Sequence, residues 1–113
     1  MNYLYGVFSD EQISQNAKYM HRDIHKLLMY KDKEIVQKVF ESDDDFKLYF
    51  FNLLTRFGGL NDLLGAPYEM VMLMSTLQVA FKEVQKESFD YKFFRKLILD
   101  AHGYLTSMFG EVR

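Results

Sequence analysis

Two histidines spaced four residues apart come nearest to a metal site in this chain. His21 and His25 stand in the run His-Arg-Asp-Ile-His, and on a helix this spacing projects both imidazoles from one face. Two such histidines can bind zinc when a third ligand joins them, and Asp23, His102 or an acid elsewhere would have to supply it. The general-base glutamate of the His-Glu-x-x-His proteases is absent. His21 and His25 are therefore weak metal candidates, and we expect two exposed polar side chains and no cofactor.

Three consecutive aspartates, Asp43 to Asp45, are a second group that could bind a cation. A calcium-binding loop needs oxygen ligands at alternating positions, a glycine and a distal glutamate, and this run lacks that pattern. The acids follow Ser42, a residue type that commonly caps helices, and negative charge stabilises a helix N-terminus. The run therefore predicts the start of a helix and not a cation or general-base site.

A pair of glycines, Gly58 and Gly59, has neither the preceding strand nor the lysine of a phosphate-binding loop. The pattern Phe57-Gly58-Gly59 predicts that a helix ends here, with Gly58 in the left-handed conformation. The chain has no cysteine, which excludes thiol catalysis, disulfide bonds and cysteine-ligated metal sites. We assign no catalytic residue and expect a protein that is not an enzyme.

The elements that position these residues are helices, because apolar residues recur with a period near 3.6 in every long segment. Helical segments are expected over about residues 10–30, 33–41, 43–57, 60–64, 67–86 and 90–109. The predicted fold class is all-α, a compact bundle of four main helices plus one or two short helical segments. The 113 residues are expected to form one domain, with the apolar arm 1–8 packed on it.

The most apolar and aromatic part of the sequence runs from residue 43 to residue 65. Its apolar stripe at helical spacing consists of Phe46, Phe50, Leu53 and Phe57. Leu48 and Phe51 point to the opposite side. A helix that is apolar on two sides is either central in a bundle or has one side against a partner. Leu48 and Phe51 are thus either covered by this chain or available to another one.

Aromatic and methionine side chains favour a binding role. Tyr and Phe make up 17% of the chain, more rings than a core of this size easily encloses. Tyrosine is enriched at interface hot spots, and methionine adapts to irregular surfaces. The residues expected to bind a partner are Leu48, Phe51, Met72, Tyr49 and Tyr68. The predicted function is a protein–protein interaction module, an accessory, assembly or inhibitor protein of a bacterial or phage system, which docks on another protein or on a second copy of itself.

A basic zone near the last predicted turn supports an alternative function. Its members are Lys82, Lys86, Lys92, Arg95 and Lys96. Acidic residues dilute the zone, and a net charge of −2 gives the chain no overall attraction to nucleic acid. A nucleic-acid-associated regulator is therefore the first alternative. A metal-dependent enzyme that uses His21 and His25 is the second.

No part of the sequence has the pattern of a secretory signal or a membrane span. The first residues lack a basic region followed by a long apolar one, and no run approaches the ~18 apolar residues that a span requires. The absence of cysteine fits a reducing compartment. We expect a cytoplasmic protein without a membrane partner.

Overall fold

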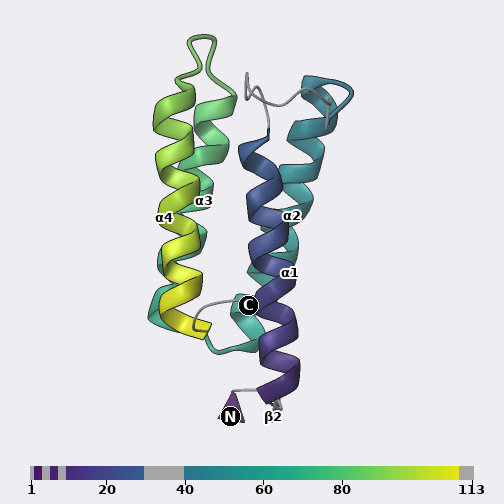
Figure 1. Ribbon diagram of the computed structural model, residues 1–113, viewed down its shortest axis with the longest axis vertical. Helices are drawn as coiled ribbons and strands as arrows, with labels where there is room; N and C mark the ends of the chain where they lie inside the picture. Colours follow the sequence, from purple (N-terminus) through teal and green to yellow (C-terminus); the bar gives the residue numbers. More distant parts are fainter. Residues whose placement is uncertain (1, 4–5, 8–9, 30–39, 110–113) are drawn as a thin grey trace.

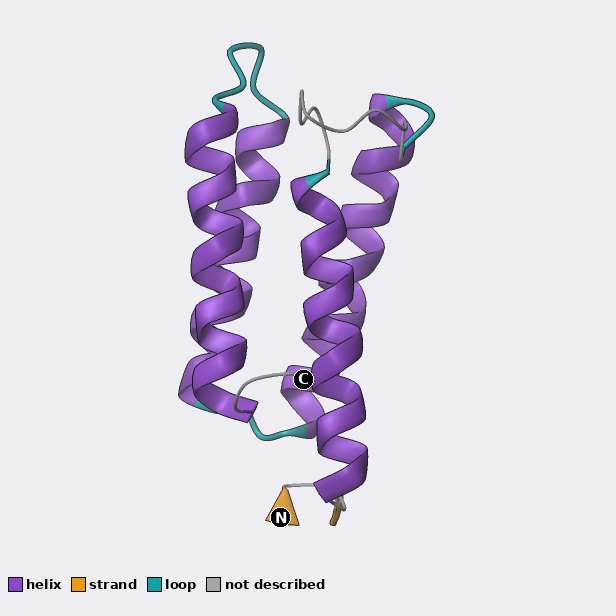
Figure 2. Ribbon diagram, viewed as in Figure 1, coloured by secondary structure: helices purple, strands orange, loops and turns teal. Residues whose placement is uncertain are grey.

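The described residues of the computed structural model form four helices in an up-and-down bundle (Figure 1). The structure describes the backbone of residues 2–3, 6–7, 10–29 and 40–109. The helices are α1 (Asp10–Leu28), α2 (Asp43–Leu63), α3 (Tyr68–Val84) and α4 (Tyr91–Phe109). Two short antiparallel strands, β1 (Asn2–Tyr3) and β2 (Gly6–Val7), precede α1. The predicted all-α class is confirmed, as the colouring of Figure 2 shows.

The core lies along the bundle axis, and all four helices contribute to it. The predicted stripe of α2 is buried, with at most 3% of any of its four side chains exposed. Phe50 contacts rings on three helices, since its centroid lies 5.9 Å from that of Phe46, 5.1 Å from that of Phe81 and 6.4 Å from that of Phe94. All three contacts are edge to face, the geometry that aromatic quadrupoles prefer. One side chain of α2 therefore contacts α3 and α4 at once.

The prediction that a helix ends at Gly58 is wrong. Helix α2 continues through both glycines to Leu63. Leu60 and Leu64 extend the buried stripe beyond the glycine pair, so ending the helix earlier would withdraw two leucines from the core. A Cβ on Gly58 would lie 3.8 Å from Cε of Met74, an ordinary contact. Core burial here outweighs the roughly 1 kcal/mol that a helical glycine costs relative to alanine.

The left-handed turn occurs instead at Gly65, where φ is 80°. Its N–H donates to the carbonyl of Asp62 at 3.2 Å, and the N–H of Ala66 donates to that of Asn61 at 2.9 Å. Ala66 is also left-handed, with φ of 53°. Pro67 then caps α3 with an extended conformation, φ −62° and ψ 152°, whereas the sequence placed it inside the helix. The helical segment before Pro67 thus ends just before Gly65, as the predicted range 60–64 implies, and the chain has no earlier break at Gly58.

Two predicted helix starts are confirmed by their caps. Oγ of Ser42 accepts a 3.1 Å hydrogen bond from the N–H of Asp45, and Oδ1 of Asp90 accepts one of 3.2 Å from Phe93. Of the helix predicted over 33–41, only residues 40 and 41 are described, and they are not helical. The side chains of the arm 1–8 lie outside the described residues. None of the helices in the described ranges combines the length and apolar character needed to cross a lipid bilayer.

Adjacent phenylalanines on α2 test this placement of the core. Phe50 is fully buried and Phe51 is 57% exposed. We expect Phe50→Ala to lower the free energy of unfolding by about 3–5 kcal/mol, because it removes a ring and leaves a cavity. Phe51→Ala is the matched control and should change it by less than about 1 kcal/mol. Urea unfolding followed by circular dichroism measures both, and equal losses would contradict the placement.

Candidate functional site

The carboxylate of Asp23 organises the seam between α1 and α2. Its Oδ2 lies 3.1 Å from Nη1 of Arg56 on α2, and its Oδ1 lies 3.4 Å from Nη2 of Arg22 on α1. The backbone carbonyl of Asp23 accepts a 2.9 Å hydrogen bond from the hydroxyl of Tyr49. The Asp23 side chain is only 13% exposed, so both arginines pair with a carboxylate largely withdrawn from water. One residue of α1 therefore joins α2 at two points.

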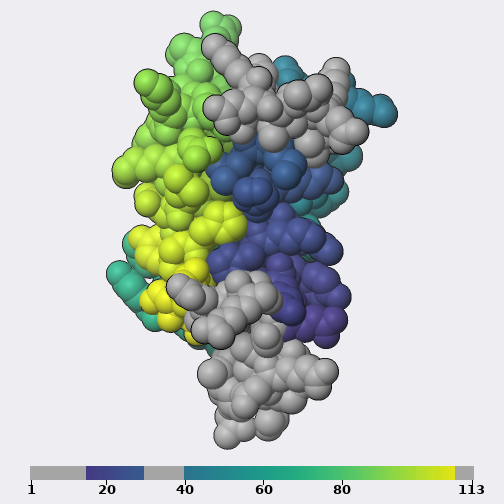
Figure 3. Space-filling model, viewed as in Figure 1, coloured from purple at the N-terminus to yellow at the C-terminus, as the bar shows by residue number. Residues whose placement is uncertain are grey.

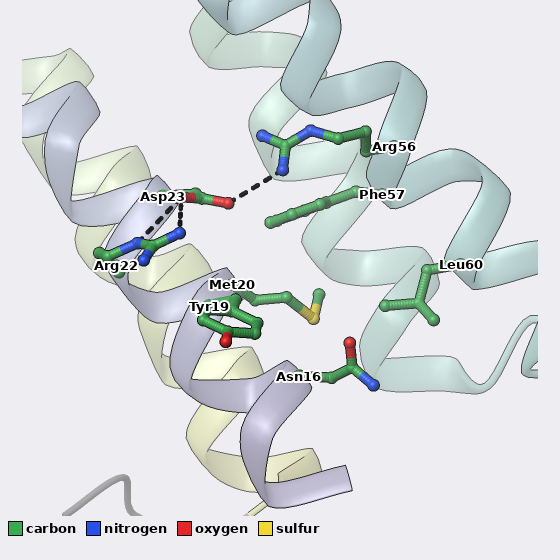
Figure 4. A pocket seen from close by; sticks show the side chains of 8 residues that line it. All are labelled: Asn16, Tyr19, Met20, Arg22, Asp23, Arg56, Phe57 and Leu60. Carbon is green, nitrogen blue, oxygen red and sulfur yellow. Dashed lines mark hydrogen bonds and ion pairs between the residues drawn. The ribbon is translucent and has the colours of Figure 1, made fainter. Parts of the chain in front are cut away.

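A cavity of about 350 Å³ opens beside Asp23. It is lined by Asn16, Tyr19, Met20, Arg22, Asp23, Arg56, Phe57 and Leu60. Figure 4 shows the last three, from α2, facing the α1 side chains across the opening. A second cavity of about 390 Å³ lies further along α1, lined by Arg22, Asp23, His25, Lys26, Met29 and Tyr49. Guanidinium and carboxylate groups beside apolar walls supply contacts for recognising a polar or charged group.

Tyr49 links helices α1 and α2 and is half-buried. The ammonium of Lys26 lies 4.8 Å from the centre of its ring, a cation–π distance. Burial, reinforced by the Asp23 carboxylate, raises the pKa of Tyr49 to about 12, against an opposing effect of the two arginines. The hydroxyl is therefore protonated, and able to donate to Asp23, throughout the neutral range.

The chain has three histidines, and they meet between α1 and α4. Nδ1 of His21 lies 2.9 Å from Nδ1 of His102, and the ring centroid of His25 lies 6.2 Å from that of His102. The first two rings are nearly parallel, with 8° between their planes. An approach of 2.9 Å is closer than the ~3.5 Å at which stacked atoms rest, so these rings lie edge to edge and share a hydrogen bond.

Burial lowers the pKa of both hydrogen-bonded histidines. For His102 the value falls to about 4, because of burial first and then repulsion from His21 and His25. For His21 the direction is the same and the cause is burial. The pair is therefore neutral at pH 7.

The structure brings His102 beside the predicted metal candidates, as one of the two named sources of a third ligand. The other named source, Asp23, pairs with Arg56 towards α2. Nδ1 of His21 and Nδ1 of His102 face each other at 2.9 Å, so they do not converge with His25 on a common point. In the part of the chain that is described, no group of three His, Asp or Glu residues is arranged to hold a metal ion.

The predicted partner-binding residues do not form one continuous surface. Leu48 and Phe51 lie together on the outer side of α2, 59% and 57% exposed. Tyr68 is 72% exposed but begins α3, at the opposite end of the bundle from the start of α2 (Figure 1). Met72 is half-buried on α3, and Tyr49 is the link between helices described above. Of the five, Leu48 and Phe51 are the two neighbouring side chains on one helix that are both more than half exposed.

Acidic partners divide the predicted basic zone. Nζ of Lys86 lies 2.9 Å from Oε2 of Glu83, and Nζ of Lys96 lies 3.6 Å from Oδ2 of Asp100. Glu83 also accepts a 3.1 Å hydrogen bond from the N–H of Asp90, and the bonds from Lys86 and Asp90 lower the pKa of its carboxyl. The other members of the zone are exposed: Lys82, Lys92 and Arg95. A zone interrupted in this way has a weak positive field, which does not favour a nucleic-acid interface.

The fold defines this protein as an up-and-down four-helix bundle over the residues described. Comparisons with protein-family models, with curated proteins and with solved structures gave no significant match.

The seam around Asp23 is the feature that sequence patterns missed. Phe57 was expected in an apolar stripe, whereas Arg22 and Arg56 were given no role. Charged residues on helix surfaces look alike in a sequence until the helices are placed side by side. The available signal was position, since Asp23 and Arg56 each immediately precede a buried residue and so lie on the flank of a core stripe.

Replacing Tyr49 by phenylalanine tests the seam. Loss of the hydroxyl that bonds to Asp23 should lower the free energy of unfolding by about 1 kcal/mol at pH 7. The folded pKa of about 12 exceeds the ~10 of an unfolded tyrosine, so folding favours the neutral phenol. That contribution is complete below pH 10 and is lost as the pH rises towards 12. The difference between wild type and Tyr49→Phe should therefore shrink in urea unfolding at pH 11.

The matched control is Tyr68→Phe, because this tyrosine is 72% exposed. It should leave the free energy of unfolding at pH 7 nearly unchanged. A Tyr49→Phe variant that behaves like this control, or whose deficit is the same at pH 7 and pH 11, would show that the hydroxyl does not join the helices.

Proposed function

We propose that this chain is a non-enzymatic protein–protein interaction module that binds through the outer face of α2. The observation that carries the proposal is the exposure of Leu48 and Phe51, at 59% and 57%, on a helix whose opposite side is fully buried. Neighbouring exposed apolar side chains are a feature of association surfaces, and large aromatic residues contribute most to such interfaces.

The spacing on this face suits a partner helix. Leu48, Phe51 and Thr55 stand at intervals of three and four, the spacing of a helix-pairing seam. The Thr55 hydroxyl donates to the carbonyl of Phe51 at 3.1 Å, so its own helix already satisfies it. One turn further, nothing lies within 4 Å of the Cβ position of Gly59, and another backbone can approach closely there. Exposed polar residues of the same helix, Asn52 and Asp62, supply a rim.

The partner that fits is a helix with apolar residues at the same spacing. The α2 helix of a second copy is one that the sequence itself supplies, and two identical faces related by a two-fold axis are self-complementary. Self-association is therefore the first form of the proposal to test, and a helix of another protein is the second. The protein would act as an accessory, assembly or inhibitor protein in a bacterial or phage-infected cytoplasm, with which its lack of cysteine agrees.

The test is the double variant Leu48→Glu with Phe51→Glu. Two charges on an apolar face should abolish self-association, measured by sedimentation equilibrium over a wide concentration range. The circular dichroism spectrum and the urea midpoint should change little, since both side chains are exposed.

Val79→Glu with Leu99→Glu is the matched control, because these residues are 46% and 47% exposed on α3 and α4. It adds the same charge on other helices and should leave association intact. Dissociation by both double variants, or unfolding of the first, would remove the argument for the α2 face. A monomeric wild-type chain would refute self-association, and the α2 face would then need a purified partner whose binding the first variant abolishes.

A further inference from the structure

Only one hydrogen fits between the two Nδ1 atoms of His21 and His102, which lie 2.9 Å apart. One ring donates its Nδ1–H to the Nδ1 lone pair of the other across 2.9 Å. A neutral imidazole carries one hydrogen, so the donor ring has a bare Nε2 and the acceptor ring has an Nε2–H. Both Nε2 atoms are buried and have no hydrogen-bond partner. Exchanging the two tautomers changes which Nε2 carries the hydrogen but satisfies neither.

Protonation of this pair is limited by the same geometry. A first added proton goes to the bare Nε2 and leaves the Nδ1–H···Nδ1 bond in place. A second must go to the accepting Nδ1, which would put two N–H groups head to head at 2.9 Å. That step replaces a hydrogen bond by the repulsion of two cations. The closed pair therefore accepts one positive charge at most.

The charges around the pair do not relieve this repulsion. On α1, Lys18 and His25 share the side of His21, three residues before it and four after. On α4, Arg95 lies two turns from His102 on the same side. The neighbouring carboxylates have other partners, since Asp23 pairs with Arg56 and Asp100 with Lys96.

Two further acids lie at the start of α1. Asp10 and Glu11, whose side chains are not described, precede His21 by ten residues or more, about 15 Å along the helix. At that distance they are poorly placed to offset a second charge on the pair.

The pair lies where it can control the contact between two helices. Figure 3 shows side chains of α1 and α4 meeting directly on the viewed face. Fully buried residues of the same helices, Ile24, Ile98 and Leu105, belong to the core behind this contact. Separation of α4 from α1 would therefore bring apolar side chains into contact with water. Further along, the hydroxyl of Tyr91 donates to the carbonyl of Leu28 at 2.9 Å and also joins the two helices.

From this geometry we propose that the His21–His102 pair is an acid-sensitive latch, which holds α4 against α1 while it carries at most one charge and opens when both rings are protonated. The latch involves neither Leu48 nor Phe51, so its test does not depend on whether the proposed interface on α2 exists.

The sign of the effect follows from the pKa of His102, about 4 in the folded chain against about 6.5 unfolded. The unfolded chain binds the proton more readily, so the full stability is present above pH 6.5 and is lost as the pH falls towards 4. At pH 5 these two values lower the folding equilibrium constant by at most about 30-fold relative to pH 7.5. Because His102 is partly exposed to water, which reduces the effect of burial on its pKa, we expect the folding equilibrium constant to fall about tenfold.

Urea unfolding at pH 7.5 and pH 5.0 tests the latch in three proteins. The wild-type folding constant should fall about tenfold between the two conditions. His102→Gln keeps a hydrogen-bonding side chain but cannot take up the second proton. The folding constant of this variant should fall about threefold or less between pH 7.5 and pH 5.0. His25→Gln is the control, because it removes a histidine that is not part of the pair, and it should retain most of the wild-type fall. The proposal is overturned if the folding constant falls equally in wild type and His102→Gln, or if it no longer falls in His25→Gln.

A measurement on the wild-type chain does not depend on whether a variant folds. Nitrogen-15 spectra of the imidazole rings at pH 7.5 should show one ring of the pair as the Nδ1–H tautomer and the other as Nε2–H. On acidification, the signals of His102 should change at a pH well below 6.5. If both rings are Nε2–H tautomers, or if His102 titrates as an unfolded histidine does, the pair does not share a proton and there is no latch.

Discussion

Burial of one aromatic stripe is the constraint on which the rest of this structure depends. Phe46 and Phe50 of the α2 stripe are fully buried in the fold, where they meet Phe94 of α4 edge to face. Each such ring buries about 150–250 Å², which at roughly 25 cal/mol per Å² contributes on the order of 4 kcal/mol. In a bundle of four helices around one axis, each helix turns one stripe towards that axis. The packing that buries Phe50 therefore leaves Leu48 and Phe51 outside.

The helical period shows how far the fold can be predicted from the sequence. It identified the four helices, and capping chemistry located the start of α2 at Ser42, because both signals are local. It failed at Gly58, where a local preference of about 1 kcal/mol opposed the burial of leucines further along. Gly65 carried an equally good turn signal and lies where the apolar stripe stops. A glycine thus ends a helix when the core no longer requires the next turn.

The candidate sites were less predictable, because they depend on which helices become neighbours. Spacing alone placed His21 and His25 on one face, but the partner that reaches His21 is 81 residues away. Tyr49 was expected at a binding surface, but it is half-buried because its hydroxyl donates a hydrogen bond to the backbone carbonyl of Asp23 on α1. The aromatic excess in the composition gave no indication of which rings stay outside. Such assignments need the relative placement of helices, which no pattern within a single helix contains.

Helix α1 packs on the core through Met20, Ile24 and Leu27, and it adds polar contacts to this apolar packing. Towards α2 it is held by the carboxylate of Asp23, and towards α4 by the imidazole of His21. The Arg56 partner of Asp23 is more than half exposed, so that ion pair contributes about 1 kcal/mol or less and weakens with salt. The imidazole contact weakens with acid. The contacts between the buried aromatic rings depend on neither salt nor acid, because phenylalanine carries no charge. Salt and pH therefore act first on these polar contacts of α1, while its apolar contacts and the aromatic contacts of α2 with α3 and α4 are unaffected.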